Sequence, residues 1–200
     1  YRATCPAETK TVVFGGKAHL VHYPVRGGSL VNIVAIFGDD WHEPGWSAPG
    51  ERADILARYP DSSWPPAARA ILTAPRHWHK WALYDRGPLA RWGMGGVTLL
   101  GDAAHPMLPY LAQGAAMAIE DAAVLAQRLA DTPDDPEGAM LRYERARRWR
   151  TARAQRAARR NGTVYHLDGA GAWLRTLVLR AMGGERLLAR YDWLYGWRPA

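Results

Sequence analysis

The chain has 200 residues, of which 48% are hydrophobic and 22% are charged, a composition typical of a globular protein with one substantial core or parts of two. No run of about 18 apolar residues is present, so we expect no membrane span, and the single cysteine, Cys5, excludes an internal disulfide and favours a reducing cytoplasm. The net charge of +7 is local, because residues 142–160 hold nine arginines and one acid, a sum of +8, and the rest of the chain sums to −1.

Residues 1–86 have the pattern of a small sheet with two short helices. Three segments are predicted to be strands from their apolar and β-branched residues. These predicted strands are residues 17–25, 29–37 and 77–84. The first two are joined by Arg26-Gly27-Gly28, which has the length of a hairpin turn. Helical patterns occupy residues 51–59 and 65–73, and the polar, Pro- and Gly-rich stretch 39–50 is predicted to be a loop.

Residues 87–136 carry the most informative pattern in the chain. An apolar run at 97–100 is predicted to be a strand, and it ends in Gly101-Asp102. A Pro-punctuated loop follows, and a long helix is predicted from about Gly114 until residues 132–136. Glycine lets a ligand approach the backbone, a carboxylate accepts hydrogen bonds from hydroxyls, and a helix start offers N–H groups and the positive end of a dipole. This order of residues therefore indicates a site for a polar ligand. Apolar residues repeat at helical spacing at Ala118, Ile119, Ala122, Ala123, Leu125, Ala126 and Leu129.

Residues 137–200 are predicted to be mainly helical. A helix is expected from residue 137 to residue 160, where Asn161-Gly162 would stop it. A second helix is expected over residues 173–182, broken by Gly183-Gly184. Residues at i+3 spacing give the first helix one less polar stripe, which consists of Tyr143, Ala146, Trp149 and Ala152. Arginines cover its other faces.

Several aromatic side chains admit both a structural and a functional interpretation. His105 either braces its loop through its ring nitrogens or takes part in chemistry. His77 and His79 share a strand face, as a metal-binding pair would, but no third ligand accompanies them, so we predict no metal site. Three tryptophans are interpreted as core or domain-interface residues rather than as a substrate cage. They are Trp78, Trp81 and Trp92.

The stretch Leu100-Gly101-Asp102-Ala103-Ala104-His105-Pro106, followed by Glu120-Asp121-Ala122, resembles the FAD-dependent aromatic-ring monooxygenases, the family of salicylate hydroxylase and the hydroxybenzoate hydroxylases. Further stretches similar to the same family extend the resemblance over nearly the whole chain. They are His22-Tyr23-Pro24, Arg26-Gly27-Gly28, Tyr84-Asp85-Arg86 with Pro88, Tyr143-Glu144 with Arg147, and Tyr165-His166-Leu167. The resemblance implies an α/β fold, which is α+β in this part of the protein. It implies a substrate-binding sheet region in residues 1–86, the C-terminal part of a Rossmann-like FAD-binding domain in residues 87–136, and a C-terminal helical region in residues 137–200.

The family's Gly-Asp motif lies over the ribityl chain of FAD. The resemblance implies that Asp102 accepts a hydrogen bond from a ribityl hydroxyl and that Gly101 gives the clearance. Backbone N–H groups at the helix start are implied to face the pyrimidine side of the isoalloxazine, where the helix dipole favours the negative charge of reduced flavin. These cofactor-binding residues are Gln113, Gly114, Ala115 and Ala116. The family usually carries a second glycine and often an asparagine there, where this chain has Ala112 and Ala116, so the flavin contact is expected to rest on the backbone.

Three residues are candidates for contact with a substrate. Pro109, four residues after His105, is implied to lie beside the substrate and the reacting edge of the flavin. His19 and Tyr23 lie on one face of a predicted strand and match the spacing of a His/Tyr pair that contacts the phenol in hydroxybenzoate hydroxylases. We interpret His19 as the acceptor of the phenol proton and Tyr23 as an orienting hydrogen-bond partner. Ordinary strand packing is the alternative for both.

The resemblance implies a monooxygenase that uses FAD with NADH or NADPH and in which a flavin C4a-hydroperoxide, formed with dioxygen, hydroxylates a small phenolic acid or a related aromatic. The Gly-x-Gly-x-x-Gly turn with which the family begins follows no apolar strand here. The chain is therefore expected to be the C-terminal part of a longer, cytoplasmic enzyme and to be inactive alone. The alternatives are a monooxygenase of the same fold that acts on a larger polycyclic or quinoline-type substrate, and a non-catalytic remnant of the FAD fold.

The arginine-rich residues 142–160 admit two interpretations. One is a salt-bridged helix that packs on the flavin domain or on the second subunit of a homodimer. The other is an arm that binds a polyanion. Nucleic-acid recognition usually adds a fold motif or interleaved aromatic residues to positive charge. Only Tyr143 and Trp149 interrupt the arginines, so we predict no nucleic-acid partner.

Overall fold

The computed structural model describes residues 10–198, so Cys5 lies outside the described part of the chain. The chain divides into two compact units. The sheet unit comprises Tyr1–Ala82 and Thr163–Ala181, and the helical unit comprises Leu83–Gly162 and Met182–Ala200. The functional roles assigned to the three sequence regions remain predictions.

The centre of the sheet unit is a three-stranded antiparallel sheet in the order β1-β2-β3. Its strands are β1 (Thr11–Phe14), β2 (Ala18–Val25) and β3 (Leu30–Phe37). The turn η1 (Arg26–Gly28) joins β2 to β3, which confirms the first two predicted strands and their hairpin turn. β1 is not evident from the sequence pattern. It pairs along β2, with Phe14 opposite His19.

One face of this sheet is covered by two helices, α1 (Arg52–Arg58) and α2 (Pro66–Thr73), which confirms both predicted helices. Leu20 of β2 lies in the buried apolar cluster between sheet and helices, and the hydroxyl of Tyr59 donates a hydrogen bond to the backbone oxygen of His19 at 2.9 Å. The other members of the cluster are Ala18, Ile55, Trp64, Ala68, Ile71 and Leu72. Because side chains alternate along a strand, the opposite face of β2 carries the side chains of His19 and Tyr23.

A second, two-stranded sheet in this unit pairs β4 (Ser47–Gly50) with β5 (Trp78–Trp81). β4 lies inside residues 39–50, so the prediction of a loop over that whole stretch is wrong at its end. The four residues of β4 include Pro49 and have no alternating pattern, and only the pairing with β5 makes them a strand. β5 ends at Trp81, three residues before the predicted end of that strand.

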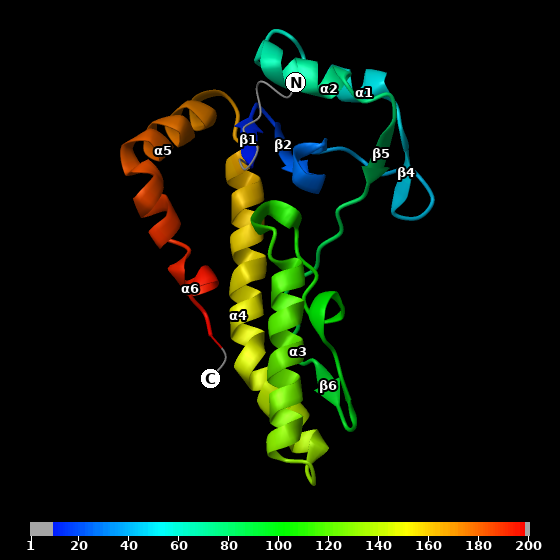
Figure 1. Cartoon of the computed structure of the whole chain (residues 1–200), viewed down its shortest axis with the longest axis vertical. Coiled ribbons are helices and arrows are strands. Elements are labelled where there is room, and N and C mark those ends of the chain that lie inside the picture. The colour runs from blue at the N-terminus through cyan, green and yellow to red at the C-terminus, as the bar shows by residue number, and fades with distance from the viewer. Residues whose placement is uncertain (1–9, 199–200) are drawn as a thin grey trace. The chain divides into compact units, whose positions relative to one another are not determined.

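The helical unit is built on two long helices, α3 (Gly114–Asp131) and α4 (Pro136–Tyr165). Figure 1 shows α3 and the part of α4 that belongs to this unit lying side by side. Shorter elements precede α3. They are β6 (Gly93–Met94), β7 (Val97–Thr98), η2 (Gly101–Ala103) and η3 (Pro109–Leu111). β7 ends at Thr98, two residues before the predicted end of this strand, because its hairpin partner β6 is only two residues long. Leu100 nevertheless keeps an extended backbone.

The predicted stop of the long helix at Asn161-Gly162 is wrong, because α4 continues to Tyr165. Gly162 does not adopt the left-handed backbone of a helix-capping glycine. It is instead a point of close approach. A Cβ on Gly162 would lie 2.5 Å from Cε2 of Tyr110, a distance that packed side chains do not tolerate.

The apolar repeats of the two long helices mark their buried faces only in part. In α4, Tyr143 and Ala152 of the predicted stripe are buried, whereas Ala146 and Trp149 are exposed, Trp149 by 71%. The buried residues of α4 include Tyr143, Arg147 and Thr151. In α3, Ile119 of the apolar repeat is also 71% exposed. The buried residues of α3 are Met117, Asp121 and Val124. Each helix therefore buries a charged residue.

The remaining helices are α5 (Gly169–Ala189) and α6 (Asp192–Tyr195). α5 begins four residues before the predicted start, and a second helical segment continues after the break to Ala189. Its backbone leaves the helical conformation at Gly183 (φ 70°, ψ 167°), which confirms the predicted break. Within residues 10–198, no helix combines the length and the apolar character that crossing a membrane requires.

Candidate functional site

The turn after β7 places a carboxylate next to a tightly packed glycine. Gly101 has a φ of +59°, in the left-handed region where a residue with a Cβ is strained. A Cβ at Gly101 would also lie 3.1 Å from the Cβ of Ala118 on α3. Gly101 is buried, whereas the next residue, Asp102, is exposed. The turn therefore packs closely on α3 and presents Asp102 to solvent.

The amino end of α3 is the second part of the site. The first N–H groups of a helix have no partner within the helix, and the described structure shows no capping bond from the side chain of Gln113. Gly114, Ala115 and Ala116 form the first turn. Oδ1 of Asp102 lies 3.7 Å from the position that a Cβ on Gly114 would take. A carboxylate acceptor and a row of N–H donors at the positive end of a helix dipole thus lie next to each other.

The loop between these two parts contains η3. Pro109 begins η3 and is exposed. Ala112 ends it with a φ of +51°, in the left-handed region that glycine adopts without strain. A residue with a Cβ pays roughly 1–2 kcal/mol for this conformation. The loop is held from α4, where the side-chain nitrogen of Gln155 donates a hydrogen bond to the backbone oxygen of Pro106 at 2.8 Å.

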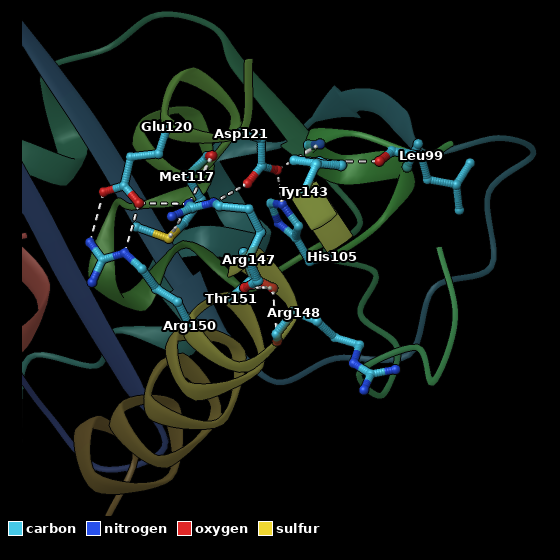
Figure 2. A network of polar contacts seen from close by, with 12 residues as sticks. Leu99, His105, Met117, Glu120, Asp121, Tyr143, Arg147, Arg148, Arg150 and Thr151 are labelled. Carbon is cyan, nitrogen blue, oxygen red and sulfur yellow. Dashed lines mark hydrogen bonds and ion pairs between the residues drawn. The ribbon is translucent and has the colours of Figure 1, made fainter. Parts of the chain in front are cut away.

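A buried carboxylate on α3, that of Asp121, fixes the start of the loop. Its Oδ2 accepts a hydrogen bond from the N–H of Gly101 at 3.2 Å and lies 2.5 Å from Nε2 of His105. Its Oδ1 accepts a hydrogen bond from Nε of Arg147 on α4 at 2.7 Å (Figure 2). Burial by itself would raise the pKa of Asp121, but the hydrogen bonds and charges of His105 and Arg147 outweigh burial and hold the pKa below its ordinary value. Asp121 is therefore ionised at neutral pH.

His105 is a buried residue that braces the loop. Its ring lies 5.4 Å from that of Trp92, measured between centroids, and its Nε2 contacts Asp121. Of the two interpretations that the sequence leaves open for His105, this geometry supports bracing.

The arginines of α4 extend this network of charges. The guanidinium of Arg147, which is fully buried, also donates a hydrogen bond to Glu120 at 2.6 Å. Arg150 donates two hydrogen bonds to Glu120, both at 2.7 Å (Figure 2). The arginines of residues 142–160 that pair with carboxylates are Arg142, Arg147, Arg148, Arg150 and Arg159. This pairing supports the interpretation of the segment as a salt-bridged helix.

The two remaining predicted site residues, His19 and Tyr23, lie in the sheet unit. His19 is only 1% exposed, and its Nδ1 lies 2.9 Å from Nε2 of His166. The ring of Tyr165 also packs against it, with a centroid separation of 5.3 Å. Burial, and next the charge of a protonated His166, lower the pKa of His19 to about 4, so His19 is neutral at neutral pH. Tyr23 is half-buried, and the ammonium of Lys10 lies 5.7 Å from the centre of its ring.

The lowered pKa of His19 predicts a dependence of stability on pH. Its folded-state pKa of about 4 lies below the ordinary value of 6.5, so the unfolded chain binds more protons between these two pH values. The free energy of unfolding is expected to fall, by on the order of 1–3 kcal/mol, as the pH drops through this window. His19→Gln should flatten the profile, which thermal unfolding at a series of pH values measures.

The matched control for this experiment is Val21→Ala, on the same face of β2. It removes packing but no titratable group, so it should lower stability by a similar amount at every pH. A His19→Gln profile with the wild-type slope would contradict the shifted pKa of His19.

The other histidines and tryptophans singled out in the sequence are placed as follows. Among residues 10–198, no group of three side chains that could hold a metal ion is present. The ring of His79 lies 4.8 Å from that of Trp81. Trp92 belongs to the core of the helical unit, Trp78 packs against the core of the sheet unit, and Trp81 is 52% exposed.

The family described as "FAD binding domain" matches residues 6–160. The chain belongs to this family. Among the relatives of this chain, 3-hydroxybenzoate 6-hydroxylase 2 of Aquipseudomonas alcaligenes is 39% identical over 183 residues. These residues are 92% of this chain and 57% of the relative. Among the similar solved structures, a salicylate hydroxylase substrate complex has a TM-score of 0.79 at 27% identity, and the match covers 95% of this chain and 47% of that structure's chain. Klebsiella pneumoniae R204Q HpxO complexed with FAD has a TM-score of 0.77 at 27% identity, with coverage of 94% and 49%.

These matches confirm the predicted family, the α/β fold class and FAD as the cofactor of the family. This chain spans about half the length of the relatives that it matches. Its own residues fit the cofactor, because the exposed carboxylate of Asp102 offers an acceptor and the start of α3 offers N–H donors, while Gly101 lets the turn that carries Asp102 pack closely on α3. The predicted cofactor residues and Pro109 all lie in the helical unit, whereas His19 and Tyr23 lie in the sheet unit.

The sequence pattern assigned no role to three residues that contact candidate residues or their turn, two in the helical unit and one in the sheet unit. Asp121 and Arg147 occur in the stretches that carry the resemblance, but only the structure shows that they hold the Gly101 turn. The available signal was a carboxylate inside an otherwise Ala-rich helix repeat. His166 was likewise part of a recognised stretch, and its contact with His19 joins residues 147 positions apart.

Proposed function

We propose that this chain is the part of an FAD-dependent hydroxylase that holds the ribityl chain and one side of the flavin ring. The observation that carries the proposal is the Gly101 turn, which presents Asp102 beside the amino end of α3 in a chain that belongs to an FAD-binding family. In this proposal the whole protein uses NADH or NADPH and dioxygen to hydroxylate a small phenolic acid. Two electrons come from the nicotinamide, one oxygen atom enters the ring, and the other leaves as water.

The residues of the helical unit would bind and orient the cofactor. Asp102 would accept a hydrogen bond from a ribityl hydroxyl, and the N–H groups of Gln113, Gly114, Ala115 and Ala116 would face the pyrimidine side. Pro109 would lie beside the substrate. The flavin, once reduced, supplies the chemistry that activates dioxygen for transfer of one oxygen atom to an aromatic ring. The positive end of the α3 dipole favours the negative charge of the reduced ring.

The residues of the sheet unit would orient and deprotonate the phenol. His19 is neutral at neutral pH, which is the form that accepts a proton, and its lowered pKa makes it a weaker base than an ordinary histidine. Nδ1 of His19 contacts His166, and we assign the phenol proton to the imidazole of His19. Tyr23, four residues along the same face of β2, would hold the phenol oxygen by a hydrogen bond.

The names of the relatives support the substrate class. The relative from Aquipseudomonas alcaligenes is named for 3-hydroxybenzoate and the solved neighbour for salicylate, and both are small phenolic acids. A screen of hydroxybenzoates that follows NAD(P)H oxidation by the full-length protein, together with identification of the hydroxylated product, tests the proposal. Turnover of larger polycyclic or quinoline-type compounds alone would favour the alternative substrate class. The mass of the same preparation in solution tests the homodimer that the sequence allows.

Asp102→Ala is expected to weaken FAD binding by the full-length protein by about tenfold, the effect of losing a hydrogen bond to a charged group. Titration of the apoprotein with FAD, followed by flavin fluorescence, measures the dissociation constant. Asp134→Ala is the matched control, because Asp134 is also an exposed aspartate of the helical unit but lies beyond the far end of α3. Equal affinities of wild type and Asp102→Ala would contradict the role of the Gly101 turn.

A further inference from the structure

The carboxylate of Asp121 collects hydrogen-bond donors from three separate segments. The N–H of Gly101 comes from the turn after β7, Nε2 of His105 comes from the following loop, and Nε of Arg147 comes from α4. Asp121 is completely buried. A buried carboxylate with three such partners is rigidly held, because any rotation of its side chain would leave a buried polar group unpaired.

The neighbouring Glu120 belongs to the same network but not to the loop. It accepts hydrogen bonds from Arg147 and Arg150, and its side chain is 17% exposed. Two adjacent carboxylates therefore share Arg147, and Asp121 is the one that also contacts the turn at Gly101 and His105 (Figure 2). This pair allows the effect of the turn to be separated from the effect of charge.

The conformation of Gly101 determines where Asp102 lies. Gly101 has a left-handed backbone, which glycine adopts about as readily as its other conformations because it has no Cβ, so contacts with its neighbours must select this one. Both of its backbone polar groups are engaged. The N–H binds Asp121, and the oxygen accepts hydrogen bonds from the N–H groups of Ala104 and His105, both at 2.9 Å. Loss of the bond from the N–H of Gly101 would release the peptide group between Leu100 and Gly101, which directly precedes Asp102.

We propose that Asp121 is a positioning residue of the FAD site, which acts through Gly101 and His105 and is itself fixed by Arg147. The proposal rests on the proposed function, in which Asp102 binds the ribityl chain. Asp121 does not touch the cofactor. Its ionised carboxylate keeps the turn in the one conformation that sets Asp102 beside the amino end of α3, so the affinity for FAD and the environment of the flavin depend on it.

The test compares Asp121→Asn with Glu120→Gln in the full-length protein. Each substitution removes one negative charge next to Arg147 and keeps the size of the side chain. Asp121→Asn is expected to raise the dissociation constant for FAD by roughly tenfold to a hundredfold and to change the visible circular dichroism of the bound flavin. Glu120→Gln is expected to lower the melting temperature but to leave the dissociation constant within about twofold of wild type and the flavin spectrum unchanged.

His105→Leu is a second variant for the case in which Asp121→Asn does not fold. It keeps the pair of Asp121 with Arg147 and removes the contact between Nε2 and Asp121, so it should shift the flavin spectrum in the direction expected for Asp121→Asn. Equal dissociation constants for Asp121→Asn and Glu120→Gln, or a wild-type flavin spectrum in both Asp121→Asn and His105→Leu, would overturn the positioning role alone. Failure of the wild type to bind FAD, or wild-type affinity in Asp102→Ala, would instead overturn the proposed function on which that role rests.

Discussion

Arg147→Met is expected to lower the free energy of unfolding by about 3–5 kcal/mol, the usual cost of removing one partner of a buried ion pair. Methionine fills much of the same volume, so the loss comes mainly from charge rather than from a cavity. Without the guanidinium, Asp121 loses a hydrogen bond of 2.7 Å and Glu120 loses one of 2.6 Å. Asp121 is then left as a buried carboxylate whose remaining partners are the N–H of Gly101 and Nε2 of His105.

Urea denaturation followed by circular dichroism measures this loss. Arg142→Met is the matched control, because Arg142 lies on the same helix and pairs with Asp135 at 3.3 Å in a solvent-exposed position. Exposed pairs contribute at most about 1 kcal/mol. Equal losses for Arg147→Met and Arg142→Met would show that the buried network does not carry the stability assigned to it.

His19→Ala in the full-length protein is expected to slow hydroxylation by roughly a hundredfold or more, the range of general base catalysis, while reduction of the flavin by NAD(P)H changes only a few-fold. The reason is that deprotonation of the phenol makes the ring electron-rich for the oxygen transfer, whereas hydride transfer to the flavin does not need it. Rapid-mixing measurements follow the two steps separately through flavin absorbance, and product analysis gives the fraction of NAD(P)H that ends in hydroxylated product.

His22→Ala is the control for this prediction. His22 lies on the same strand, but alternation places its side chain on the opposite face of β2 from His19. Its loss should affect stability more than the ratio of the two rates. If His19→Ala slows flavin reduction and hydroxylation equally, the role of His19 as proton acceptor is refuted.

Sequence patterns predicted the elements that depend on local rules. β2 and β3 alternate around a Gly-rich turn, α1 and α2 follow helical patterns, and α3 begins at Gly114 as expected. The break in α5 occurs at Gly183. The carboxylate and glycine of the candidate FAD site are also local, because Gly101 and Asp102 adjoin in the chain and directly precede the loop to α3.

Elements that need a distant partner were missed or misplaced. β1 and β4 are short and become strands only through pairing with β2 and β5. The contact of His19 with His166 brings together two residues whose sequence patterns are unrelated. Short segments carry too few residues for a pattern, and the backbone hydrogen bonds that stabilise them come from elsewhere in the chain.

The amino-acid sequence by itself determined the family, the main helices and strands, and the turn that presents Asp102. Only the tertiary structure decided which face of each long helix is buried, that Gly162 marks a contact with Tyr110 rather than a helix end, and that Asp121 holds the turn. The physical reason is that burial of a charge depends on its partner. Asp121 is buried because Arg147, 26 residues away, neutralises it, and a pattern that sorts residues by hydrophobicity places both on the surface.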